Sequence, residues 1–323
     1  MENDLNVSIQ GFSNKELANT IGKTTLNIID ALYKKYNLDI SKLKKVLISS
    51  DYSSALTQVS DDYNHCISST YTNSAQAVGI AQLLTKLASK EQIAEYTLVL
   101  SANFFFDIIL PDETVNLKNL SPVIHRLHHE LIHVHERNVS SLDQKKTVDD
   151  YDDALFMPGI RAWSEYLANY ESSETAPDES VKETLNTLEA TLTEVPSEIE
   201  DLIFKYKIQT LALGDMYFEV KKRIKLITNM YAYAHGYIHA WDIDMDKHFP
   251  KLTQLLSSSK LAKPLSNLDA ALIYLKTKYD CNELVSWEDF DSTTLATNEL
   301  YAAFGIRIER NKEPDTGIYI HVD

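Results

Sequence analysis

One short motif has residue types and spacing that could bind a metal ion, His129-Glu130-Leu131-Ile132-His133. On a helix, residues four positions apart lie on the same face, so the two imidazoles would converge on one point. Two convergent imidazoles are the beginning of a zinc site, and the Glu beside the first His could accept a proton from a metal-bound water. The motif therefore predicts a zinc-dependent hydrolase with Glu130 as its general base.

The residues around the motif favour a helix. Ser121-Pro122 is a typical helix start, with Ser as the N-cap and Pro in the first turn. Apolar residues then recur at three- and four-residue steps in one stripe, formed by Ile124, Leu127, Leu131 and Val134. The two His lie roughly opposite this stripe, on a face that an enzyme would cover with a second layer of structure.

A third metal ligand is expected from the next predicted helix, residues 160–170. This helix is expected to begin after Met157-Pro158-Gly159, which should interrupt regular secondary structure. Glu165 lies 32 positions after His133 (165 − 133). Zinc hydrolases with a Glu ligand take two His from one helix and the Glu from a later helix, and leave the fourth position for water. Glu165 could instead form only an i,i+4 ion pair with Arg161.

Other residues nearby compete for these roles. The rival carboxylates are Asp152, Asp153, Glu171 and Glu174. Three further His are expected to support the site or to lie at the surface rather than to bind the metal: His125, His128 and His135. The acidic run at 149–153 is expected to be a solvated loop, or else the rim of a cleft that favours cationic substrates.

The HExxH motif and the stretch 163–168 (Trp-Ser-Glu-Tyr-Leu-Ala) together resemble the zincin metallopeptidases of the gluzincin type, over residues 95–170. The resemblance implies one Zn²⁺ per chain held by His129, His133 and Glu165, and cleavage of a peptide or amide bond. It also implies that the strand at 96–103 lies beside the cleft and pairs with extended substrate. Two positions depart from the family's pattern of small or apolar residues, Arg126 and His135.

A second cluster, residues 231–239, contains three Tyr and two His. A Tyr hydroxyl or a His beside the metal can stabilise the oxyanion of peptide hydrolysis, and the candidates are Tyr233, His235 and His239. His235 and His239 are again four apart and could bind a second metal ion, but no acidic residue lies between them. A buried Tyr-rich helix with hydrogen-bonded polar tips would give the same pattern.

The hydrophobic pattern predicts an α+β fold of two subdomains. Residues 1–140 form an α/β part that ends in the HExxH helix, and residues 141–323 form a mainly helical part that carries the third ligand. Within these parts we expect a helix at 14–36, strands at 45–50 and 96–101, a strand or helix at 75–87, a helix start at Pro196, and a C-terminal β-hairpin from 305–309 and 317–322.

Composition limits the partners. A net charge of −16 over 323 residues argues against binding to nucleic acid or to anionic membrane surfaces. The first twenty residues lack an apolar signal core, and two Cys imply no disulfide framework, so a cytoplasmic location is expected. The resemblance to the zincins implies a peptide or protein substrate. Two other classes remain open: a non-catalytic metal-binding protein, and an acidic helical interaction or regulatory protein in which the motif is a coincidence.

Overall fold

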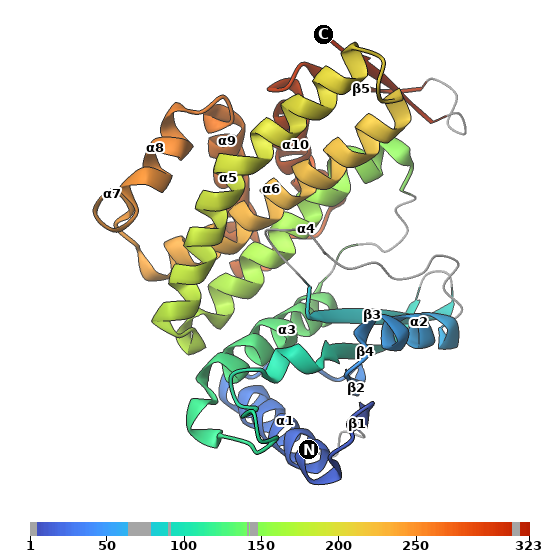
Figure 1. Ribbon diagram of the computed structural model, residues 1–323, viewed down its shortest axis with the longest axis vertical. Coiled ribbons are helices and arrows are strands. Elements are labelled where there is room, and N and C mark those ends of the chain that lie inside the picture. The colour runs from blue at the N-terminus through green and yellow to red at the C-terminus, as the bar shows by residue number, and fades with distance from the viewer. Residues whose placement is uncertain (1–4, 64–78, 90–91, 141, 143–147, 312–316) are drawn as a thin grey trace. The chain divides into compact units, whose positions relative to one another are not determined.

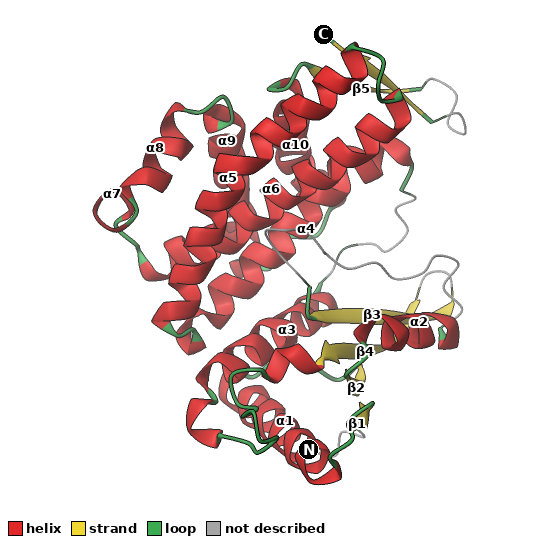
Figure 2. Ribbon diagram, in the orientation of Figure 1, coloured by secondary structure: helices red, strands yellow, loops and turns green. Residues whose placement is uncertain are grey.

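A computed structural model of the chain describes residues 5–63, 79–89, 92–140, 142, 148–311 and 317–323. Contacts divide the chain into two compact units: unit 1 contains Met1–Ser140 and Glu171–Ser180, and unit 2 contains Ser141–Tyr170 and Val181–Asp323. A small mixed sheet and many helices, followed by a C-terminal hairpin, confirm the predicted α+β class (Figure 2). The segment Glu171–Ser180 joins unit 1 through its contacts, which the sequence did not lead us to expect.

Unit 1 is built on a four-stranded sheet in the order β1-β2-β4-β3 (Figure 1). The strands β1 (Asn6–Gln10), β2 (Leu43–Ser49) and β4 (Gln92–Ser101) run parallel, and β3 (Ala81–Ser89) pairs antiparallel with β4. The strands predicted at 45–50 and 96–101 are thus confirmed as β2 and β4. The substrate-pairing role implied for 96–103 is wrong for β4, because its two edges are already hydrogen-bonded to β2 and β3.

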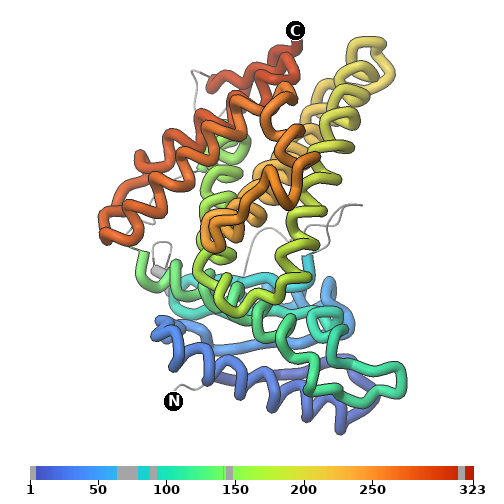
Figure 3. The backbone as a smooth tube through the Cα atoms, turned by 90° about the vertical axis from the view of Figure 1, so that its left-hand side faces the viewer, coloured from blue at the N-terminus to red at the C-terminus, as the bar shows by residue number. Residues whose placement is uncertain are grey.

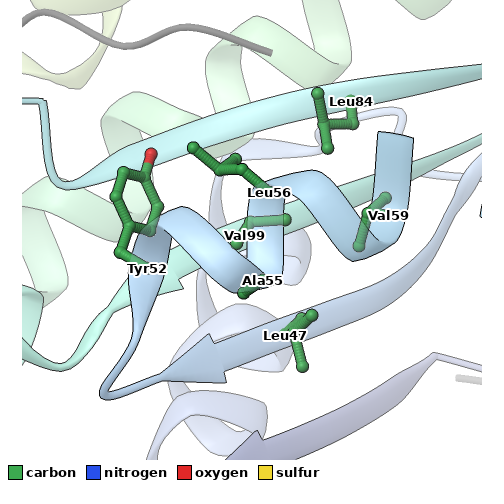
Figure 4. Packing of buried hydrophobic residues seen from close by; sticks show 7 residues of the cluster. All are labelled: Leu47, Tyr52, Ala55, Leu56, Val59, Leu84 and Val99. Atoms are coloured by element: carbon green, nitrogen blue, oxygen red, sulfur yellow. The ribbon is translucent and has the colours of Figure 1, made fainter. Parts of the chain in front are cut away.

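Helices cover both faces of this sheet. Helix α1 (Lys15–Tyr36) is capped by Asn14, confirming the helix predicted at 14–36, and its Gly22 packs closely on Ile9 of β1. Ile9 pairs with Ile48, so α1 covers the face on which Ile48 lies. Alternation along β2 places Leu47 on the opposite face. Figure 4 shows that face, where α2 (Tyr52–Asp62) packs on side chains of β2, β3 and β4.

The HExxH helix, α3 (Ser121–Val139), contacts both α1 and β3. It follows two short 3₁₀ turns, Ala102–Phe105 and Leu117–Asn119. The helix begins where the sequence predicted, but its N-cap is Leu120 rather than Ser121, and Pro lies in the first turn. Unit 1 thereby presents the motif on a helix that packs beside the edge strand β3.

Unit 2 is a set of helices followed by a hairpin. Its long helices are α4 (Asp150–Ser172), α5 (Asp178–Lys207), α6 (Leu213–Trp241), α9 (Ala262–Asp280) and α10 (Asp291–Ala302), although the end of α4 and the start of α5 belong to unit 1. Its short elements are α7 (Met245–His248), α8 (Pro250–Ser258) and a 3₁₀ turn (Trp287–Phe290), and another 3₁₀ turn in unit 1, Ser173–Thr175, follows α4. Helices α9 and α10 lie side by side (Figure 3), and β5 (Ile306–Arg310) pairs antiparallel with β6 (Ile318–Val322), which confirms the predicted hairpin.

Two helix boundaries predicted from proline are wrong. Pro158 lies inside α4 and Pro196 lies inside α5. A Cβ at Gly159 would lie 2.5 Å from Thr293 Oγ1, so this glycine allows α4 to approach α10 closely and does not form a turn. Buried Val195 and Ile199 continue the apolar face of α5 past its proline. Packing on both sides offsets the hydrogen bond that each proline removes.

The acidic run at 149–153 is mostly the first turn of α4, where negative charge is favourable at the helix N-terminus. Asp149 and Asp152 both pair with Arg310 of β5, and Asp153 pairs with Lys221 of α6. These carboxylates are engaged by cations of unit 2 itself. No helix in the described part of the chain combines the length and the apolar character that crossing a bilayer requires.

Candidate metal centre

The two His of the motif lie side by side on α3. Their Nε2 atoms are 3.1 Å apart, and the rings meet edge to face with centroids 4.7 Å apart. Two imidazole ligands of a tetrahedral zinc ion, each about 2.0–2.1 Å from the metal, would have nitrogens roughly 3.3 Å apart. The pair His129 and His133 therefore stands close to the ligand-to-ligand spacing of a zinc site.

This His pair is buried although it lies opposite the apolar stripe of α3. His129 and His133 are each 8% exposed, an exposure similar to that of some residues of the hydrophobic core. Glu130 is half-buried, and Glu136 Oε2 lies 4.0 Å from Nδ1 of His133. A carboxylate beside the second ring nitrogen can orient a ligand His and raise its basicity. The position of Glu136, one turn after His133, suits that function.

The other His of α3 serve the packing of unit 1. The Nδ1 atoms of His125 and His128 lie 3.3 and 3.0 Å from Thr175 Oγ1. Burial, with a smaller effect from neighbouring His, lowers the pKa of His125 to about 3, and burial lowers the pKa of His128 to about 4. His135 accepts a hydrogen bond from the backbone N–H of Asp39 through Nδ1, at 2.7 Å. These three His support the fold.

Arg126, which departs from the zincin pattern, has a structural explanation within unit 1. Its guanidinium pairs with Asp107 and donates a 2.7 Å hydrogen bond to the carbonyl oxygen of Phe104. It also lies over the rings of Phe104 and Phe106. Through these contacts Arg126 links α3 to the 3₁₀ turn Ala102–Phe105.

The proposed third ligand, Glu165, lies on α4 in unit 2. Lys225 interacts electrostatically with Glu165 and with Arg161. Burial lowers the pKa of Lys225 to about 8, Arg161 adds to this shift, and Glu165 opposes it. Three of its rivals are held in ion pairs elsewhere, Asp152 by Arg310, Asp153 by Lys221 and Glu174 by Lys35.

Helix α6 presents the Tyr- and His-rich cluster to α4 and α9 within unit 2. Gly236 brings α6 against α4, because a Cβ there would lie 2.7 Å from the carbonyl oxygen of Tyr166. Asn169, one turn after Glu165, donates a 2.9 Å hydrogen bond to the carbonyl oxygen of Tyr233. Burial raises the pKa of Tyr231 and Tyr237 well above the usual range, so these two hydroxyls stay protonated.

His235 and His239 meet a carboxylate that sequence reasoning missed, Asp269 of α9. Its Oδ1 lies 2.7 Å from His235 Nδ1 and 3.3 Å from His239 Nε2. Burial raises the pKa of Asp269, but the two His outweigh burial and hold the net pKa below its usual value. Burial lowers the pKa of His239, and Asp269 opposes this. Asp269 follows His239 by 30 positions (269 − 239), with no motif to signal the contact.

No family model, no curated protein and no solved structure matches this chain.

Proposed function

We propose that the protein is a zinc-dependent hydrolase of the metallopeptidase type, with His129 and His133 as two of its metal ligands. The observation that carries this proposal is the pair of buried imidazoles whose Nε2 atoms are 3.1 Å apart on one helix. Two neutral imidazole ligands suit zinc, and the Glu within the same motif would act as the base for a metal-bound water.

We propose Glu165 as the third ligand. Helix α4 is continuous from Asp150 to Ser172, and its end is fixed in unit 1, where His125 hydrogen-bonds to the backbone of Ser172. Glu165 lies two turns before Ser172, about 10 Å along the axis, and His129 and His133 lie one and two turns after His125. Glu165 and His133 thus lie at similar distances along their own helices from the contact between Ser172 and His125.

The roles of the protein groups follow from general acid–base chemistry. Bound zinc would supply a Lewis acid for a substrate carbonyl and a water of lowered pKa at its fourth position. Glu130 would accept a proton from that water and would deliver it to the leaving amine nitrogen. The amide bond is the matching substrate, because its poor leaving group needs this proton.

The edge strand β3 is the place we propose for extended substrate. Among the described residues, β3 pairs with β4 alone, and it contacts α3. An extended peptide can hydrogen-bond along such an edge as an added strand. The assignment of Tyr233, His235 or His239 to the oxyanion stays a prediction.

Metal content is the decisive experiment. The full chain, purified without a His tag or chelator, should contain zinc that is lost from the α3 site in His133→Ala and in Glu165→Ala. Cleavage of a peptide library by the zinc-loaded chain, but not by these variants, would then establish the activity. A chain that binds no zinc even after reconstitution would refute the hydrolase proposal.

A further inference from the structure

Three side chains of unit 2 form a second cluster of metal-ligating groups, independent of the HExxH motif. His235 and His239 lie one turn apart on α6, and Asp269 faces them from α9. One donor atom from each residue lies within 4.8 Å of the other two. Two imidazole nitrogens and a carboxylate oxygen are a ligand set that suits zinc and related divalent transition metals.

The donor atoms of this cluster are close but poorly hydrogen-bonded. His235 Nδ1 and Asp269 Oδ1 are 2.7 Å apart and interact electrostatically, but neither buried atom makes a hydrogen bond of good geometry within the described residues. His235 Nε2 is also buried and makes no hydrogen bond within the described residues. Buried polar atoms without partners are uncommon in native proteins and call for an explanation such as a missing ion. A cation that binds Nδ1 and Oδ1 together would satisfy both.

Neighbouring side chains fix the orientation of the imidazole rings of His235 and His239, as metal binding requires. The hydroxyl oxygen of Tyr166 lies 3.0 Å from His239 Nδ1, which leaves Nε2 directed to Asp269. The ring of Tyr231 stacks on His235 with centroids 3.9 Å apart and an interplanar angle of 21°. A hydrogen bond through the second ring nitrogen is the usual means by which proteins orient a metal-binding His.

The cluster is also reachable from solvent. The side chains of His239 and Asp269 are 22% and 27% exposed, whereas His235 is nearly buried. An ion could enter on the exposed side and keep a water in its fourth position. A site with three protein ligands and one open position is typical of zinc in enzymes.

We propose that His235, His239 and Asp269 bind a second divalent transition-metal ion of the zinc class, which links α6 to α9. All three ligands belong to unit 2, so this site does not depend on the HExxH pair. The cluster also gives His235 and His239 a function other than stabilising the oxyanion.

The test uses the full chain with the first site silenced by His129→Ala and His133→Ala. This variant should still bind one Zn²⁺ per chain by titration calorimetry and by metal content after gel filtration. Adding Asp269→Asn should weaken the affinity by more than the roughly 10- to 100-fold that loss of an orienting partner costs, and Tyr166→Phe should weaken it within that range. Asp280→Asn is the matched control, because Asp280 lies at the exposed end of the same helix.

Each result decides the proposal. Zinc that binds the silenced chain and is lost with Asp269→Asn, but not with Asp280→Asn, supports it. A silenced chain that binds no Zn²⁺ at micromolar concentrations overturns it, and so does binding that Asp269→Asn leaves unchanged. Circular dichroism of each variant shows that the helices remain folded. The HExxH proposal is judged separately, by zinc binding to Asp269→Asn with the first motif intact.

Discussion

At the scale of single residues, Glu130 has a function that one substitution isolates. Glu130→Gln removes the carboxylate that accepts the proton but keeps the size of the side chain and leaves the ligands in place. General acid–base catalysis contributes about 10²- to 10⁴-fold to rate, so kcat should fall by that factor while metal content stays at the wild-type level. Rates on an identified peptide and metal analysis of the same sample check this.

Glu136→Gln, one turn beyond His133, is the control for a carboxylate that only orients a ligand. Near-normal turnover in Glu130→Gln would exclude Glu130 as the base.

The buried His of α3 predict a second residue-scale effect, acid destabilisation. An unfolded His titrates near pH 6.5, whereas the pKa of His125 is about 3 and that of His128 about 4 in the folded chain. Below pH 6.5 the unfolded state therefore binds protons that the folded state excludes, and stability falls by up to about 1.4 kcal/mol per His for each pH unit.

Thermal midpoints of the chelated protein between pH 7.5 and 5.0 measure this loss. The double variant His125→Gln/His128→Gln should have a flatter pH profile than the wild type, whatever its absolute stability. Parallel pH profiles for the two proteins would show that His125 and His128 are not the source of the acid destabilisation.

The residues of the candidate site differ in how far sequence could predict them. His129 and His133 were predictable because helical periodicity alone places residues four apart on one face. Asp269 was not, because its contact with His235 depends on how α9 packs on α6. The roles of His125, His128 and His135 in packing likewise arise from partners distant in sequence, Thr175 and Asp39.

At the scale of elements, local patterns predicted what local forces determine. The strands β2 and β4, helix α1 and the C-terminal hairpin follow from apolar periodicity and caps. The helix boundary predicted at Pro158 was wrong because the tendency of proline to end a helix is local. The close approach of Gly159 to Thr293 shows that tertiary packing outweighs this tendency.

The contact between α4 and α6 gives an element-scale prediction with a control in the same helix. Gly236→Ala would force a methyl group to 2.7 Å from the carbonyl oxygen of Tyr166, so α6 must shift. We expect a loss of about 1–3 kcal/mol in the free energy of unfolding. Gly214→Ala, also in α6, meets nothing within 4 Å and should be neutral or stabilise by about 0.5–1 kcal/mol. Urea unfolding of both variants tests this; equal stabilities would show that the helices are not in close contact at Gly236.

At the scale of the whole molecule, the two metal proposals differ in which unit responds to zinc. All three tryptophans, Trp163, Trp241 and Trp287, belong to unit 2, so their fluorescence reports the unfolding of that unit. Far-UV circular dichroism reports the helices of both units. The two signals can therefore assign the effect of an ion to a unit without separating them.

The decisive comparison uses Asp269→Asn, which leaves only the HExxH site. A ligand that binds only the native state at a hundred times its Kd stabilises by about 2.7 kcal/mol. If Glu165 of unit 2 completes the site of His129 and His133 in unit 1, Zn²⁺ should raise the midpoints of both the tryptophan and the circular dichroism transitions, and EDTA should reverse this. Adding Glu165→Ala should abolish the zinc shift of the tryptophan signal. A zinc shift seen by circular dichroism alone, before Glu165 is replaced, would mean that the third ligand lies in unit 1, where Glu136 and Glu171 are candidates.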